Sequence, residues 1–179
     1  MNLGDAFLSH GLLEIGLFQS EDRRLSYRLR LDLLPAYPQV LAACAAQMAE
    51  RLMRVDRLVC PSDSVPLGTA MSLQTRIPLV YSRGRGEGPV QDWVGAYDVG
   101  HPAALLCNVL PDWETFIKWH SQLMSVGLEL VQVLAVVDVH RLSLNLPTHA
   151  LFRLEDWLRV PHDTLPPGAA EAILSDLAR

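Results

Sequence analysis

Short apolar segments alternate with amphipathic helical patterns through the middle of the chain, between residues 57 and 137. Helices are predicted at Val65–Gln74 and Asp112–Val126, where apolar residues recur at helical spacing. Strands are predicted at Arg57–Cys60, Ile77–Tyr81, Trp93–Tyr97, Ala103–Cys107 and Leu130–Val137. Strands that alternate with helices of this length form a parallel sheet covered on both faces, so the pattern predicts an α/β fold.

Other elements are predicted on both sides of this alternating region. Before it, leucine and phenylalanine spacing predicts a helix within Ala6–Phe18, strict alternation predicts a strand over Leu25–Leu33, and an Ala-rich segment predicts a helix over Val40–Met53. After it, a short helical segment is predicted at Glu155–Val160. We expect residues 1–160 to form a single domain, followed by a C-terminal segment, residues 161–179, with a Pro-rich start and a short helix at Ala169–Leu177.

Charge and composition exclude several classes of function. The 179 residues include 15 Lys+Arg and 20 Asp+Glu, which gives a net charge of −5, and Lys118 is the single lysine. A mildly acidic chain lacks the basic surface that nucleic-acid binding requires, so no nucleic-acid partner is expected. The apolar stretch Leu128–Val139 is interrupted by polar residues, and no signal-peptide pattern precedes it, so we expect no membrane partner and a cytoplasmic location.

Metal binding and cysteine chemistry have little support in the residue spacing. Three cysteines without a CxxC pair indicate reduced thiols and not a disulfide or zinc framework. No metal-ligand pattern links the six histidines, so no metal is expected and structural roles are favoured for His10, His101, His120, His140, His149 and His162. Cys107, with His101 and Asp112 nearby in sequence, is a candidate nucleophile, but burial at the end of a core strand is favoured.

The predicted helix Asp112–Val126 carries two apolar stripes. One stripe is expected to pack on the sheet, and the second requires another partner, which is a subunit, a different protein or the C-terminal tail, unless the helix is buried widely. The first stripe contains Trp113, Phe116, Ile117 and His120, and the second contains Trp119, Leu123 and Val126.

A separate cluster of arginines is interpreted as a solvated strand face, with a position near a ligand or dimer contact as the alternative. The cluster contains Arg23, Arg24, Arg28 and Arg30.

Three stretches of the sequence together resemble the orotate phosphoribosyltransferase family. They are GLLEIGLFQSEDRRLSYRLRLDLLPAYPQVL, VDRLVCPSDSVPLGTAMSLQTRIPLVYSR and WVGAYDVGHPAALLCNVLPDWETFIKWHSQLMSVGLELVQVLAVVDV, and LPTHALFRLEDWL is similar to the closing strand and helix of that family. The resemblance covers about residues 11–160. It implies a type I phosphoribosyltransferase fold with an N-terminal hood of helix and hairpin, and it implies a homodimer.

The phosphoribosyl loop of that family is altered in this chain. Two adjacent acidic residues, which bind the ribose hydroxyls in the family, are replaced by Cys107 and Asn108. The family continues with a Thr-Thr-Gly-Gly-Ser/Thr loop that holds a phosphate at a helix N-terminus. The matching residues are Pro111, Asp112, Trp113, Glu114 and Thr115, of which only Thr115 agrees. Asp112 is a good N-cap, so we expect its side chain to bind the free N–H groups of the helix.

The pyrophosphate loop and the flexible loop depart from the family in the same direction. The family has a Gly-Gly pair before the helix, whereas this chain has Pro61, Ser62, Asp63 and Ser64. Turn chemistry alone also explains this serine and aspartate pattern. The family's flexible loop carries lysines, whereas Ser82–Asp92 contains only Arg83 and Arg85 as possible anion contacts.

We therefore expect a degenerate, non-catalytic relative of orotate phosphoribosyltransferase that binds a ligand or a protein partner as a homodimer, without a cofactor. One alternative is a divergent active phosphoribosyltransferase that uses Arg83, Arg85 and Thr115, with Mg²⁺ and phosphoribosyl pyrophosphate, to act on a nucleobase such as orotate. A second alternative is an accessory interaction module that docks through the Trp-bearing helix.

Overall fold

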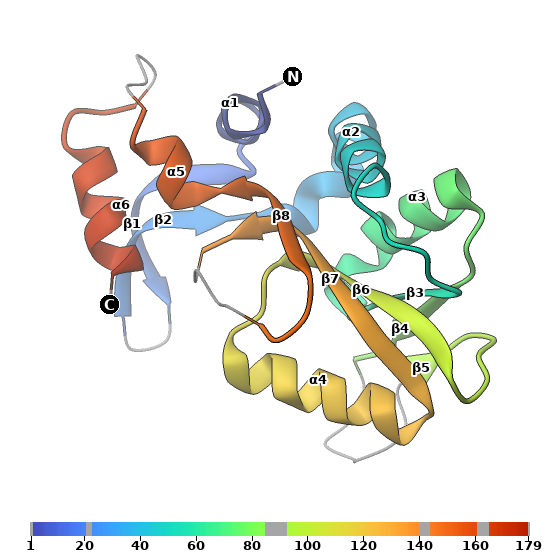
Figure 1. Ribbon diagram of the computed structural model, residues 1–179. Helices are drawn as coiled ribbons and strands as arrows, with labels where there is room; N and C mark the ends of the chain where they lie inside the picture. The colour runs from blue at the N-terminus through green and yellow to red at the C-terminus, as the bar shows by residue number, and fades with distance from the viewer. Residues whose placement is uncertain (1, 21–22, 85–92, 140–143, 161–164, 179) are drawn as a thin grey trace.

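The computed structural model describes residues 2–20, 23–84, 93–139, 144–160 and 165–178, which form two β-sheets with surrounding helices (Figure 1). The larger sheet has six strands in the order β5-β4-β3-β6-β7-β8, and every neighbouring pair is parallel except β4 with β5. The strands are β3 Arg57–Cys60, β4 Leu79–Ser82, β5 Trp93–Val94, β6 His101–Val109, β7 Leu128–Asp138 and β8 Thr148–Arg153. The predicted α/β fold is confirmed.

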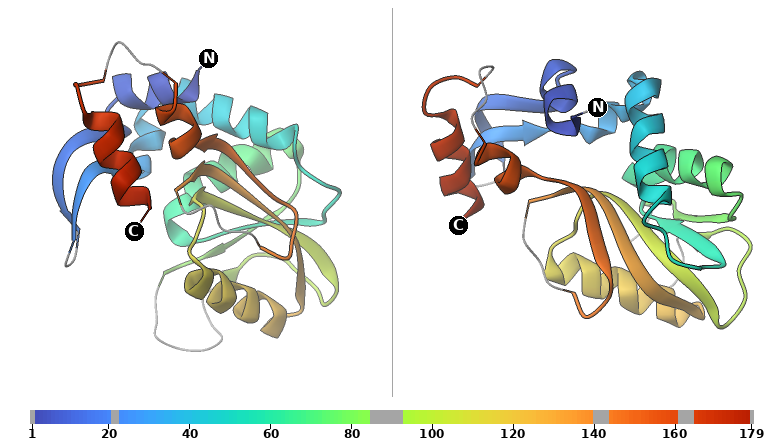
Figure 2. Two further views of the ribbon diagram at one scale, coloured as in Figure 1. Left: turned by 60° about the vertical axis from the view of Figure 1, so that its left-hand side comes forward. Right: turned by 45° about the horizontal axis from the view of Figure 1, so that its top comes forward.

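Helices cover both faces of this sheet. Helix α4 (Trp113–Ser125) packs on one face, while α2 (Pro38–Ala49) and α3 (Val65–Thr75) lie on the other (Figures 1 and 2). In β6, Ala104 and Leu106 belong to the core on the α2 and α3 side, whereas Leu105 and Cys107 belong to the core under α4. Since both faces of β6 are buried, the strand is apolar without alternation.

The two ends of the chain pack together beside the sheet and form a hood. It contains α1 (Leu3–Ser9), the antiparallel hairpin of β1 (Leu13–Ser20) and β2 (Arg23–Leu29), α5 (Leu154–Leu158) and α6 (Ala169–Leu177) (Figure 2). The ring centroids of Phe7 in α1 and Phe152 in β8 lie 5.6 Å apart. Ile173 of α6 is fully buried in the same core, and the Asp176 carboxylate accepts a 2.7 Å hydrogen bond from the Ser26 N–H of β2.

The predicted helix Ala6–Phe18 is wrong over its second half. Asn2 caps α1 by accepting from the Gly4 N–H at 3.0 Å, and the helix ends at Ser9. Gly11 then takes a left-handed backbone conformation with φ 67°, which redirects the chain into β1. Of the residues that suggested a helix, Leu13 and Leu17 therefore lie in a strand whose backbone hydrogen bonds go to β2.

The predicted strand Leu25–Leu33 is also shorter than expected, because it ends at Leu29 and a 3-10 helix, η1 (Leu31–Ala36), follows. The other predicted elements of the large sheet and its helices are present, with ends shifted by a few residues. Within the described ranges, no helix is long and apolar enough to cross a membrane.

Candidate functional site

The carboxyl ends of the parallel strands meet at one edge of the sheet, which is where open α/β sheets bind ligands. The chain leaves β3 toward β4 on one side, whereas β6 lies on the other side of β3. The connections that leave β3 and β6 run to helices on opposite faces of the sheet, so this is the point where the strand order reverses. The residues singled out from the sequence at positions 61–64 and 107–115 follow these two strands and lie at this carboxyl edge.

The loop after β3 is joined to the end of β6 by two hydrogen bonds of Asn108, and a third within the loop holds their acceptor; we call this set the Asn108 latch. Residues Ser62–Ser64 form a 3-10 turn that leads directly into α3. The buried Ser64 hydroxyl donates to the Asp63 carboxylate at 3.1 Å and accepts from the Asn108 N–H at 2.9 Å. The Asn108 side-chain amide donates to the Asp63 carbonyl at 2.8 Å. The latch therefore joins the two loops through their own polar groups.

The N-terminus of α4 is capped by its own sequence. The Asp112 carboxylate accepts from the Thr115 N–H at 2.7 Å, so the predicted N-cap is confirmed. Pro111, just before it, is buried and has no N–H to donate. Trp113 is 48% exposed, and Glu114 is exposed in the first helical turn. The start of this helix at the carboxyl edge therefore carries two carboxylates and an exposed indole.

A cavity of about 470 Å³ opens next to these loops, lined by Ser62, Val65, Tyr81, Ser82 and Arg83. The exposed Arg83 is its charged lining residue. Gly84, which follows Arg83, has a left-handed conformation with φ 65°, and a Cβ atom there would lie 2.7 Å from the Ser62 hydroxyl. Of the two possible anion contacts in Ser82–Asp92, Arg83 lies at the cavity, and Arg85 lies outside the described residues.

No family model matches the sequence. A curated relative, "HGPRTase-like protein 3" of Haloterrigena turkmenica, is 31% identical over 137 residues, which are 65% of this chain and 74% of that protein. The chain belongs to the type I phosphoribosyltransferase-like family. The sequence similarity to this relative agrees with the α/β fold described above.

Solved structures give the same phosphoribosyltransferase fold. Leishmania donovani UMP synthase is 21% identical with a TM-score of 0.84, and the match covers 98% of this chain but only 41% of that one. The orotate phosphoribosyltransferase of Francisella tularensis is 17% identical with a TM-score of 0.73, over 98% of this chain and 96% of that one. That of Aeropyrum pernix is 18% identical with a TM-score of 0.76, over 88% and 96%. The predicted type I phosphoribosyltransferase fold is therefore confirmed.

Cys107 of this phosphoribosyltransferase-like chain is unsuited to act as a nucleophile. Its side chain is 1% exposed, and burial raises the pKa of the thiol well above its usual value, with a smaller contribution from Asp63. His101 is at the opposite end of β6, where its Nδ1 accepts from the Asp98 N–H at 3.0 Å. The alternative of a Cys107–His101–Asp112 centre is therefore wrong, and Cys107 is a core residue.

The remaining histidines that the structure describes have surroundings of three kinds. His10 hydrogen-bonds the Ala6 carbonyl at 2.8 Å, the His120 ring lies 5.7 Å from that of Phe116, and His149 is exposed on β8. His140 and His162 lie outside the described residues. Among the residues described, no three His, Cys, Asp or Glu side chains gather in a way that could hold a metal ion.

The exposed face of α4 differs from the expected pair of stripes. Phe116 and Leu123 are buried against the sheet, and Trp119 and Val126 pack beside them. The outer apolar strip of this helix therefore consists of three residues, with exposures of 48%, 43% and 52% for Trp113, Ile117 and Met124.

Asp138 was not singled out from the sequence as a candidate site residue. It ends β7 at the carboxyl edge, is 5% exposed, and its carboxylate lies 3.5 Å from the Arg153 guanidinium at the end of β8. The sequence signal that could have identified Asp138 is an acidic residue at the end of a long apolar strand. This ion pair adds charge-paired side chains to the same edge of the sheet.

Proposed function

We propose that this phosphoribosyltransferase-like protein has lost phosphoribosyl transfer and binds a ligand or a protein partner as a homodimer. The Asn108 latch is the observation that carries the proposal. In an active relative the two phosphate loops need free backbone N–H groups that approach the substrate closely. Here the Thr115 N–H of the phosphoribosyl loop is bound to the Asp112 carboxylate. Asn108, at one of the two positions where the family has ribose-binding acids, is bound to Ser64 and Asp63.

Acidic side chains add electrostatic repulsion to this loss of donors. Asp63 lies in the loop after β3, and Asp112 and Glu114 lie at the start of α4. Two like charges about 4 Å apart, at an effective dielectric constant of about 20, repel by roughly 4 kcal/mol. That energy corresponds to about a thousandfold loss of affinity for a phosphate group. Magnesium diphosphate therefore does not fit these residues, and we propose no cofactor.

The cavity beside Arg83 is the place where a ligand would bind. The residues described at its lining supply the Arg83 guanidinium, two serine hydroxyls and the Tyr81 side chain. Such a set favours a ligand with one anionic group and a hydrogen-bonding body over a polyphosphate. A thermal-shift screen of nucleobases, nucleosides and nucleoside monophosphates tests this class of ligand.

Isothermal titration with phosphoribosyl pyrophosphate and Mg²⁺ tests the loss of transfer. We expect no saturable binding, because the phosphate loops are latched, capped and acidic. Saturable binding in the low micromolar range would contradict the proposal and favour the alternative of a divergent transferase using Arg83, Arg85 and Thr115. In that case an assay for pyrophosphate release with orotate and other nucleobases would identify the acceptor.

The exposed strip of α4 favours a second candidate function, an accessory module that docks a partner through this helix. Trp113, Ile117 and Met124 are large apolar side chains on one face of the helix, and such a strip is typical of interaction surfaces. A homodimer formed through α4 would cover the same strip. The oligomeric state therefore decides between the two uses of this helix.

Sedimentation equilibrium of wild type and of the double variant Trp113→Ser/Ile117→Ser separates these cases. If the wild type is dimeric and the variant monomeric, the strip is the dimer interface. If both are dimeric, the strip stays free for another partner. Leu17→Ser is the matched control, since Leu17 is 81% exposed on the hood hairpin, away from α4. A monomeric wild type would contradict the homodimer.

A further inference from the structure

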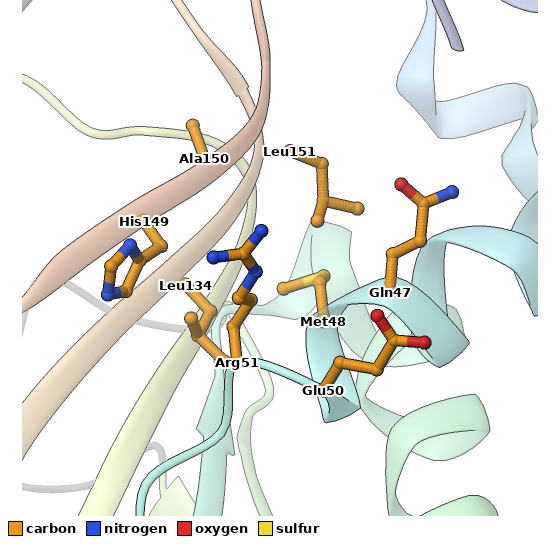
Figure 3. Close-up of a pocket in the computed structure, with 8 residues that line it drawn as sticks. All are labelled: Gln47, Met48, Glu50, Arg51, Leu134, His149, Ala150 and Leu151. Carbon is orange, nitrogen blue, oxygen red and sulfur yellow. The ribbon is translucent and has the colours of Figure 1, made fainter. Parts of the chain in front are cut away.

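A second pocket of about 220 Å³ lies beside the outer strands of the sheet and contains none of the phosphate-loop residues (Figure 3). We call it the edge pocket. It lies between the C-terminal turn of α2 and the outer strand β8, and it is lined by Gln47, Met48, Glu50, Arg51, Leu134, His149, Ala150 and Leu151. Leu134 and His149 are register partners, four residues before Asp138 and Arg153, so the pocket is about 13 Å from the carboxyl edge.

The polar groups of the edge pocket are divided by charge. Figure 3 shows the Arg51 guanidinium and the His149 ring on one side, and the Glu50 carboxylate and the Gln47 amide on the other. The Met48 side chain lies between the two sides and belongs to an apolar floor. Any molecule lying across this floor meets hydrogen-bond donors at one end and carboxylate and amide oxygens at the other.

The position of Arg51 is fixed by a buried glutamine. Gln132 of β7 is fully buried, its amide donates to the Arg51 carbonyl at 2.8 Å, and its carbonyl accepts from the Met53 N–H at 2.8 Å. The main chain after α2 is thereby clamped to the sheet. The Arg51 side chain itself is exposed, and in the described part of the chain neither its guanidinium nor the Glu50 carboxylate makes an ion pair.

The balance of charge selects the class of ligand. Arg51 and Glu50 have opposite formal charges, so a simple anion is attracted by one and repelled by the other. A molecule with both a carboxylate and an ammonium group is attracted at both ends. A guanidinium binds a carboxylate in a bidentate geometry, and an ammonium group donates well to a carboxylate and an amide oxygen. At about 30 Å³ for each water-sized group, the 220 Å³ pocket holds roughly seven such groups.

We propose that the edge pocket binds a small zwitterion of the α-amino acid class, with its carboxylate between Arg51 and His149 and its ammonium group toward Glu50 and Gln47. The short apolar part of the ligand lies on Ala150 and Leu151, the partly exposed apolar residues of the pocket. This site is separate from the carboxyl edge and does not depend on whether phosphoribosyl transfer is lost.

Isothermal titration of the full chain with glycine, serine, glutamine and leucine tests the proposal, with acetate and methylamine as single-charge probes. We expect at least one amino acid to saturate a single site and to bind more tightly than either single-charge probe. Arg51→Gln is expected to weaken this binding about tenfold or more, since a charge-assisted hydrogen bond is lost. Glu50→Gln is expected to weaken the binding of the amino acid, whereas acetate should bind at least as tightly as it binds to wild type.

Arg54→Gln is the matched control, because Arg54 is an exposed arginine three residues further on that does not line the pocket. Equal melting temperatures of the variants and wild type would show that they fold. Three results would overturn the proposal: no amino acid saturating a site below about 10 mM, acetate binding as tightly as the amino acids, or unchanged affinity in both Arg51→Gln and Glu50→Gln.

Discussion

Asn108 connects two loops that lie 45 residues apart in the chain, through the Asp63 carbonyl and the Ser64 hydroxyl. It is 5% exposed, so its amide has little access to water. Asn108 therefore has two effects at the carboxyl edge. Its hydrogen bonds shape the loop after β3, and they occupy polar groups of that loop that could otherwise bind a ligand.

Asn108→Ala is expected to lower the free energy of unfolding by about 1–3 kcal/mol, since the Asp63 carbonyl loses its donor in a partly buried place. Urea unfolding followed by circular dichroism measures this change. Asn145→Ala is the control, because Asn145 is exposed in a loop. Equal stability of Asn108→Ala and wild type would show that the latch contributes little.

Buried thiols make the fold sensitive to alkali. Burial raises the pKa of Cys44 and of Cys60 from 9.0 to about 12. A raised pKa in the folded state means that the folded protein keeps protons which the unfolded chain releases. The stability is therefore fully present below pH 9.0 and falls as the pH rises from 9.0 to about 12.

Urea unfolding at a series of pH values across that window is expected to show this fall. Cys44→Ala removes one of the three buried thiols, so its stability should depend less steeply on pH than that of wild type. All other titrating groups contribute equally to the pH dependence of both proteins, so the difference between their slopes reports Cys44 alone. Identical slopes for the two proteins would be evidence against a buried, neutral Cys44 thiol.

At the scale of elements, α4 depends on one side chain for its first turn. Asp112→Ala removes the acceptor of the Thr115 N–H and is expected to cost about 1 kcal/mol of stability. Asp112→Ser keeps an N-cap and removes the charge, so its stability should stay close to that of wild type. Urea unfolding of the two variants checks the ranking. If Asp112→Ser is as unstable as Asp112→Ala, the charge and not the cap stabilises the helix.

The elements of the sheet were predictable because their signals are local. Arg57–Cys60 has the predicted bounds, since a buried parallel strand reads as an apolar run. The helix predicted within Ala6–Phe18 failed because the leucine spacing suits a half-buried strand as well as a helix. The left-handed Gly11 and the pairing with β2 decide that this segment is a strand, and the local sequence pattern does not contain the pairing partner.

The candidate sites depend even more on contacts between distant segments, which a local sequence pattern does not contain. The Asp112 cap joins residues three apart and was predictable from sequence. The Asn108 latch and the edge pocket join segments that are 45 and about 100 residues apart. Tertiary packing alone brings these side chains together, so neither site has a signature in the residue spacing.

At the scale of the whole molecule, the C-terminal helix joins the first strands of the chain. The Asp176 carboxylate accepts from the Ser26 N–H. Burial, and to a smaller extent the charge of Asp176, raises the pKa of Tyr27 on the same strand. Ile173 lies in the core cluster that also contains Phe7 of α1 and Phe152 of β8. The segment after residue 164 therefore contributes to the hood as a packed element.

Ile173→Ala is expected to destabilise the protein by about 2–5 kcal/mol, because it leaves a cavity at a fully buried position. If α6 and the sheet form one cooperative unit, fluorescence and circular dichroism should report a single transition shifted to lower urea concentration. Leu73→Ala is the matched control, since Leu73 is 78% exposed on α3, outside the strip of α4. Two separate transitions in Ile173→Ala, or a loss no larger than that of the control, would mean that the C-terminal helix unfolds independently of the rest of the molecule.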